Sequence, residues 1–164
     1  MIKIIANFSI ISVSFLFKTT IKIYIDNLKL FEYRIIFSKM SKLFRAMKCD
    51  ENNLPLLGQS ASKLGVRPNK DIPIDAQGYV HPQTGGMSVT VDDVMCLPPH
   101  RRPPDFNGTG KDPVFSINKE QLPRTLTARQ QGSPHHYLIE PSDTCIFAQY
   151  EAHLFSTRPN WVRL

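Results

Sequence analysis

The chain has 164 residues, of which 41% are hydrophobic and 21% charged. It is long enough for one domain with its own hydrophobic core, but short for two such domains. Its formal net charge is +6, but residues 1–39 carry six Lys/Arg against two Asp/Glu, which leaves fourteen against twelve for residues 40–164. The globular part is therefore nearly neutral. It lacks the cluster of basic residues that is typical of a nucleic-acid-binding protein, so we expect no specific nucleic-acid binding.

Residues 1–39 differ in character from the rest of the chain. Ile4–Phe17 is an apolar run between Lys3 and Lys18, which gives it the outline of a signal-peptide core, although it is too short to span a bilayer. No small-x-small cleavage site comes after it. We favour translation that begins at Met40, which would make residues 1–39 an upstream extension with no role in the domain formed by residues 40–164. The alternative is a leader or membrane anchor, and a leader would make the protein secreted.

Cysteine and histidine usage predicts neither a disulfide framework nor a metal site. Cys49, Cys96 and Cys145 are widely spaced and odd in number, which favours reduced thiols and a cytoplasmic setting, in the producing or the target cell. The five histidines lack the short-spaced pairing that nucleates a zinc site. We therefore expect no metal.

From residue 40 onward the pattern predicts short strands separated by long connections. A strand over residues 41–47 places Leu43 inward, Phe44 on the other face and Arg45 near its end. Residues 50–75, rich in Pro and Gly, predict a surface connection with one helical turn at 59–64.

Residues 78–80 and 87–91 predict two strands joined as a hairpin through residues 82–86, where Gly85 and Gly86 can take positive φ. Residues 97–110 contain four prolines and predict an exposed loop of polyproline character. Because these prolines flank two arginines, the loop also allows a peptide-binding role with SH3-type domains, although a plain connection is favoured.

Two further strands are expected at 114–117 and 136–139, while residues 120–130 stay open between a frayed helix and a loop. Ile146, Phe147, Tyr150 and Leu154 then recur at helical spacing, with a cap at Ser142 or Asp143. Because strands and helices do not alternate as in βαβ units, the mixture predicts an α+β fold.

Three blocks of this sequence together resemble a cytotoxin family exported by bacterial type VI secretion, whose fold is that of the ADP-ribosyltransferases. The blocks are Leu43-Phe44-Arg45-Ala46, Tyr79 with Pro82 and Thr84-Gly85-Gly86-Met87-Ser88-Val89, and His136-Tyr137 with Ile139, Pro141 and His153-Leu154. The resemblance spans roughly residues 41–155. It implies a split mixed or antiparallel sheet with few short helices. It also implies an NAD-dependent mono-ADP-ribosyltransferase toxin that cleaves the nicotinamide–ribose bond and modifies an intracellular target.

The resemblance also implies roles for individual residues. Arg45 would hold a phosphate of NAD, Ser88 would hydrogen-bond the ribose or orient an acid, and His136 would bind the adenosine side or transfer a proton. The other candidates would contact NAD through backbone in the turn or through a tyrosine ring stacked on nicotinamide. These are Tyr79, Thr84, Gly85, Gly86 and Tyr137.

The acid that stabilises the ribosyl cation in this enzyme class has two candidates. Gln149-Tyr150-Glu151 has the Gln-x-Glu form of the motif, which makes Glu151 a catalytic candidate on a predicted helix, and Glu140 is the other. Met87 stands where the toxin family usually places a second hydroxyl residue. The alternative function is therefore a catalytically inactive relative that acts as a binding module. The partners implied are NAD, an unidentified macromolecular acceptor and an immunity protein.

Overall fold

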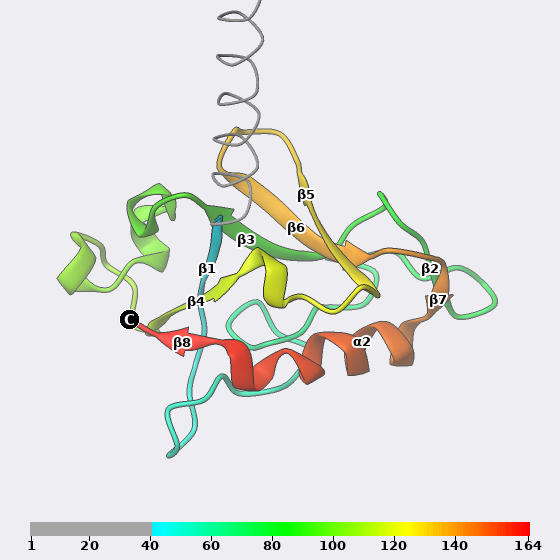
Figure 1. Cartoon of the computed structure of the whole chain (residues 1–164), viewed down its shortest axis with the longest axis horizontal. Coiled ribbons are helices and arrows are strands. Elements are labelled where there is room, and N and C mark those ends of the chain that lie inside the picture. The colour runs from blue at the N-terminus through cyan, green and yellow to red at the C-terminus, as the bar shows by residue number, and fades with distance from the viewer. Residues whose placement is uncertain (1–40) are drawn as a thin grey trace, which may run out of the picture. The chain divides into compact units, whose positions relative to one another are not determined.

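A six-stranded antiparallel sheet organises residues 41–164, the part of the chain that the computed structural model describes (Figure 1). The strand order is β5-β6-β3-β1-β4-β8. The strands are β1 (Lys42–Ala46), β3 (Met87–Val91), β4 (Val114–Asn118), β5 (Leu126–Gln130), β6 (His136–Pro141) and β8 (Val162–Arg163). A separate two-stranded pair joins β2 (Tyr79–Val80) to β7 (Cys145–Ile146), and α2 (Phe147–Ser156) comes directly after β7. The predicted α+β class is confirmed.

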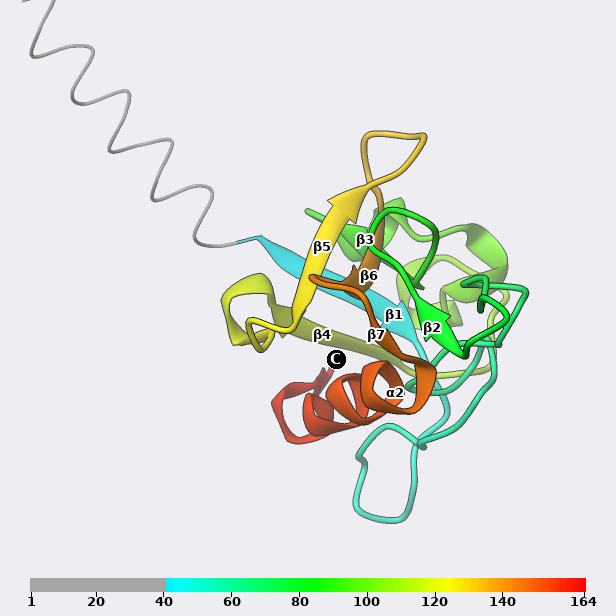
Figure 2. The ribbon, with the colours of Figure 1, turned by 90° about the vertical axis from the view of Figure 1, so that its right-hand side faces the viewer.

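The main core lies between one face of this sheet and α2, which runs beneath the strands in both views (Figures 1 and 2). Apolar side chains alternate along β3, so Met87, Val89 and Val91 enter the core while Ser88 is exposed on the other face. From α2, the buried side chains of Tyr150 and Leu154 meet them.

Tyr150 ties α2 to the sheet. Its hydroxyl donates to the carbonyl oxygen of Ile139 at 2.7 Å and accepts from the backbone N–H of Met87 at 3.3 Å. Burial raises the pKa of Tyr150 well above its ordinary value, so the hydroxyl stays protonated. The helix is therefore fixed to β3 and β6 by hydrogen bonds as well as by packing.

A second, smaller apolar cluster covers the opposite face of β1. It contains Phe44, Ala46, Val114 and Leu97, and Leu97 belongs to the proline-rich connection. As predicted, Leu43 and Phe44 point to opposite faces of the sheet. The connection itself forms short 3-10 helices and not an open polyproline segment. These are Pro99–Arg101 and Pro104–Phe106, and a third, Val94–Cys96, comes directly before the connection.

The predicted hairpin through residues 82–86 is wrong. β2 pairs with β7, and β3 pairs with β1 and β6. Positive φ occurs at Gln83 (66°) and not at Gly85 or Gly86. The reason is a long-range contact: the Gly86 N–H donates to the carbonyl oxygen of Asp71 at 2.9 Å, which packs this turn against a distant loop.

The segment 50–75 also differs from its prediction. The turn expected at 59–64 is a single hydrogen-bonded turn, in which Lys63 N–H donates to Ser60 O at 3.2 Å. It joins two extended pieces that lie side by side, since Leu64 N–H donates to Leu56 O at 2.8 Å. Leu64, Val66 and Ile72 are fully buried, so the segment contributes to the main core and does not merely cross the surface.

Residues 126–130 are a strand, where the sequence left helix and loop open. β5 pairs with β6 from Leu126 opposite Pro141 to Gln130 opposite Tyr137. The helix α2 begins after Ile146 and has no side-chain cap, so the predicted cap at Ser142 or Asp143 is wrong. No helix within residues 41–164 has the length and apolarity to cross a membrane. The predictions for residues 1–39 lie outside the described residues.

Candidate functional site

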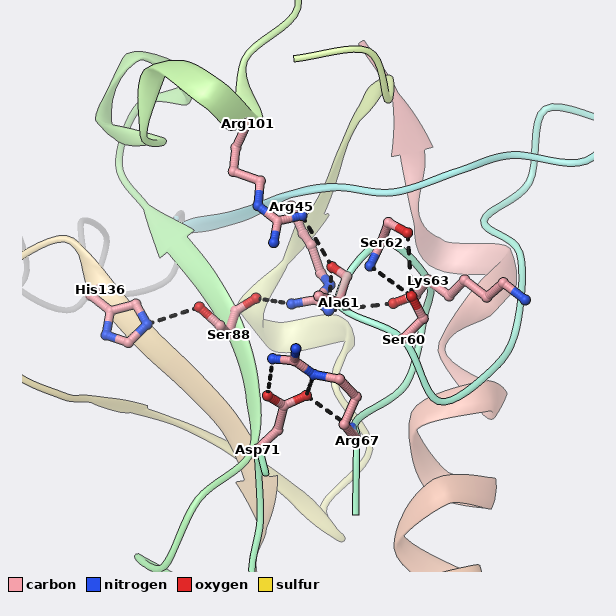
Figure 3. A network of polar contacts seen from close by, with 10 residues as sticks. All are labelled: Arg45, Ser60, Ala61, Ser62, Lys63, Arg67, Asp71, Ser88, Arg101 and His136. Atoms are coloured by element: carbon pink, nitrogen blue, oxygen red, sulfur yellow. Dashed lines mark hydrogen bonds and ion pairs between the residues drawn. The ribbon is translucent and has the colours of Figure 1, made fainter. Parts of the chain in front are cut away.

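A cavity of about 300 Å³ opens where β1 and β3 separate. Their pairing ends at Phe44 opposite Thr90, and the next residue of β1 is Arg45. Arg45, Ser88 and His136, which lie far apart in the sequence, all line this cavity. The structure therefore brings three of the predicted site residues together (Figure 3).

Among the described residues, Arg45 is a buried cation without an acidic partner. The residue is 7% exposed, and its guanidinium donates to three backbone carbonyls, those of Ser88, Ala61 (3.1 Å) and Lys63 (3.4 Å). Within residues 41–164 it forms no ion pair with a carboxylate, and its Nε atom is buried with no hydrogen-bond partner. Burial, together with the charge of Arg101, lowers the pKa of Arg45 to about 10. The group therefore keeps its charge at neutral pH in a setting that disfavours charge.

Two further arginines surround the cavity. Arg101 comes from the proline-rich connection and donates to Ala61 O at 3.4 Å, the same carbonyl that Arg45 contacts. Arg67 forms a forked ion pair with Asp71, with contacts of 2.5 Å to Oδ1 and 3.0 Å to Oδ2. The cavity lining thus contains three arginines and one aspartate, which is an excess of positive charge.

Asp71 is the only carboxylate that lines this cavity among the described residues. Burial alone would raise the pKa of Asp71, but hydrogen bonds from the side chain and backbone of Arg67 outweigh it and hold the pKa below its ordinary value. Asp71 is therefore an ionised group in a fixed orientation (Figure 3).

Ser88 and His136 are directly hydrogen-bonded. Ser88 Oγ lies 2.8 Å from His136 Nε2, and His136 Nδ1 lies 2.9 Å from the carbonyl oxygen of Gln131. A carbonyl can only accept, so in the neutral imidazole Nδ1 carries the hydrogen and Nε2 accepts from the serine hydroxyl. The adjacent strands β3 and β6 hold the two side chains on the same face.

Three of the predicted NAD-contacting residues lie away from this cavity. Tyr79 is 41% exposed on β2, and Thr84 Oγ1 donates to His81 O at 2.7 Å. Tyr137 packs against the main core, with Lys119 Nζ 5.9 Å from its ring centroid.

Gly85 and Gly86 contact protein backbone. A Cβ at Gly85 would lie 2.3 Å from Asp71 O, and one at Gly86 would lie 2.4 Å from Ile139 O. Only glycine allows such close approach. The turn therefore positions the loop that carries Asp71.

Neither glutamate candidate lines the cavity. Glu151 lies on α2 beside a separate, open hollow formed with residues 57–59 and Phe155. Glu140 is 1% exposed, and its carboxylate accepts from Arg129 Nε at 2.8 Å and Nη2 at 3.0 Å.

Sequence reasoning missed Asp71, Arg67 and Arg101. All three lie in segments that the sequence presents as plain connections, and the Arg67-x-x-x-Asp71 spacing alone does not distinguish a site. Among residues 41–164 no group of three or more His, Cys, Asp or Glu side chains could hold a metal ion.

Comparison with known protein families places most of the chain in one of them. A model of the family described as Tse2 ADP-ribosyltransferase toxin matches residues 41–156. No curated protein and no solved structure matches significantly. The matched range contains every residue that lines the cavity and ends with the last residue of α2.

Proposed function

Since the chain belongs to the Tse2 ADP-ribosyltransferase toxin family, we propose that it binds NAD in the cavity around Arg45, cleaves the nicotinamide–ribose bond and transfers ADP-ribose to a macromolecule. The observation that carries the proposal is the buried Arg45 guanidinium, which has no carboxylate partner within the described residues. A diphosphate would supply the anionic partner that Arg45 lacks, through charge-assisted hydrogen bonds.

The size of the cavity suits part of NAD. At about 300 Å³ it is at the lower end of ligand cavities, which span roughly 300–1,000 Å³. We propose that it encloses the nicotinamide, its ribose and the diphosphate, while the adenosine lies towards the cavity mouth.

The proposed cleavage step depends on a negative group that stabilises positive charge on the ribose. Departure of nicotinamide leaves positive charge on the ribose, and a fixed negative group nearby stabilises that charge in the transition state. Asp71, held by Arg67, is the carboxylate that we assign to this role, ahead of Glu151 and Glu140. Ser88 would hydrogen-bond the ribose, and His136 would accept or return a proton.

The direct test is release of nicotinamide from NAD by the purified full-length chain, measured with target-cell lysate as the source of acceptor. Arg45→Lys keeps the charge but loses the forked donor, so we expect the KM for NAD to rise roughly ten- to a hundredfold. Asp71→Asn keeps the shape but removes the charge, so we expect kcat to fall by roughly 10²–10³. Far-UV circular dichroism of each variant checks that the fold is retained.

Glu151→Gln is the matched comparison for Asp71→Asn, because it makes the same chemical change outside this cavity. A larger loss of kcat in Glu151→Gln than in Asp71→Asn would assign the acid to α2 and contradict our choice of Asp71. NAD binding by calorimetry without any nicotinamide release, with or without cell lysate, would favour the inactive binding module. Absence of both binding and release would refute the NAD proposal.

We also propose that the acceptor lies inside a target cell and that an immunity protein neutralises the toxin in the producing cell. Membership of the toxin family supports both statements. Expression of the chain in a host without the immunity protein should slow growth, and Asp71→Asn should relieve this. Equal toxicity of parent and variant at equal protein levels would contradict a role for Asp71 in toxicity.

A further inference from the structure

The pair formed by Ser88 and His136 has the geometry of an activated hydroxyl. The hydroxyl lies within hydrogen-bond distance of the imidazole Nε2, and the opposite ring nitrogen is fixed by Gln131 O. This is the arrangement of a nucleophile, a base and a group that orients the base. Binding of ribose would need only a hydroxyl donor and would leave the orientation of His136 unexplained.

The surroundings also favour a nucleophilic oxygen. Ser88 is exposed, and it lines the cavity with Arg45 and Arg101. Arg45 donates to the carbonyl of Ser88 itself, so a buried cation is held next to this residue. Fixed positive charge of this kind stabilises the negative charge that develops on a hydroxyl as it loses its proton.

We propose that Ser88 is a nucleophile activated by His136, and that it takes the ADP-ribosyl group of NAD, so that the chain modifies itself inside its own cavity. The identity of this electrophile rests on the proposed function. In the step, a bond forms between Ser88 Oγ and the anomeric carbon of the ribose. The bond from that carbon to nicotinamide breaks, and its electron pair leaves with neutral nicotinamide. The serine proton passes to His136 Nε2 and then to solvent.

A bulky anionic adduct on Ser88 would fill the cavity and end its own turnover. Each chain would therefore release nicotinamide in a burst and then stop when no acceptor is present. The toxin would therefore stay active only while an acceptor is available.

The first arm of the test uses the full-length chain with NAD and no acceptor. Peptide mass mapping should find one ADP-ribose on Ser88, and Ser88→Ala should lose that modification. His136→Asn keeps a donor near the position of Nδ1 but removes the base, so we expect adduct formation to slow by roughly 10²–10⁴. Nicotinamide release without any adduct on Ser88 would overturn the proposal.

The second arm needs no NAD. An aryl sulfonyl fluoride forms an oxygen–sulfur bond with an activated hydroxyl, releasing fluoride while the proton passes to the base. We expect Ser88 to be labelled and His136→Asn to lose the label. Thr144 is the internal control, because its hydroxyl also contacts an imidazole, His81 Nδ1 at 3.1 Å, but outside the cavity.

Together, the two arms of the test distinguish activation of Ser88 by His136 from the use of NAD as the electrophile. Labelling of Ser88 that depends on His136, without any NAD cleavage, would support the nucleophile and refute NAD as its electrophile. Labelling of Thr144 as strong as that of Ser88, or no labelling of Ser88, would overturn the activated serine even if NAD is cleaved.

Discussion

The ion pair between Arg129 and Glu140 gives a sharp test of what holds the sheet together. Glu140 is 1% exposed on β6, and its carboxylate accepts two hydrogen bonds from Arg129 and one from the Gln83 N–H at 3.2 Å. Arg129→Met removes two of these three donors and leaves the carboxylate buried with a single partner. Uncompensated buried charge of this kind costs roughly 3–5 kcal/mol.

The Arg129 side chain is 33% exposed, so water can reach the gap and we expect the lower end of that range, about 3 kcal/mol. For a unit of about 120 residues, the entropy of unfolding converts this loss into a fall in Tm of about 12 °C. The chain contains one tryptophan, Trp161, which is 2% exposed, so its fluorescence reports unfolding in urea.

Two controls make the result decisive. Arg124→Met changes an exposed arginine that forms no ion pair within the described residues, and it should alter stability by less than about 0.5 kcal/mol. In a Glu140→Gln background, Arg129→Met should cost under about 1 kcal/mol, because no buried charge remains. A loss of stability that is equal in both backgrounds, or below about 1 kcal/mol in the parent, would refute the reasoning.

Three further predictions concern the supports of the site. Tyr150→Phe should cost about 1–3 kcal/mol in urea unfolding, because it leaves Met87 N–H and Ile139 O without their shared partner; an unchanged midpoint would contradict this. Gly85→Ala should lower both stability and nicotinamide release, because its Cβ meets Asp71 O at 2.3 Å; release equal to the parent would show that the turn does not position the loop. The pKa of Asp71 is lowered in the folded state, so its stabilisation is present at neutral pH and lost as pH falls below about 4. Asp71→Asn should therefore show a flatter loss of stability between pH 5 and pH 2 than the parent, measured by urea midpoints.

Local alternation was enough to predict much of this fold. Leu43 and Phe44 already point to opposite faces by the two-residue period of a strand, and Tyr150 and Leu154 already share a helical face. The strand β5 escaped prediction because only Leu126 and Ala128 along it are buried apolar residues, and its pairing with β6 decides its conformation.

The site was only partly predictable, for a related reason. Arg45, Ser88 and His136 were found through resemblance, and their meeting at one cavity depends on sheet pairing that no local pattern encodes. Asp71 reaches the cavity through a loop whose placement rests on a backbone contact with Gly86. Nothing in the sequence around Asp71 signals that contact.

The close backbone contacts at Gly85 and Gly86 bear on how such toxins can be recognised. Both glycines are required by neighbouring main chain, at Asp71 and at Ile139, whether or not NAD ever occupies the cavity. A sequence search that relies on this glycine pair therefore detects the fold. It would not distinguish catalytically inactive relatives from active ones. If the proposed function is correct, a second filter would be a buried arginine such as Arg45, which has no carboxylate partner among residues 41–164, beside a cavity-lining aspartate such as Asp71.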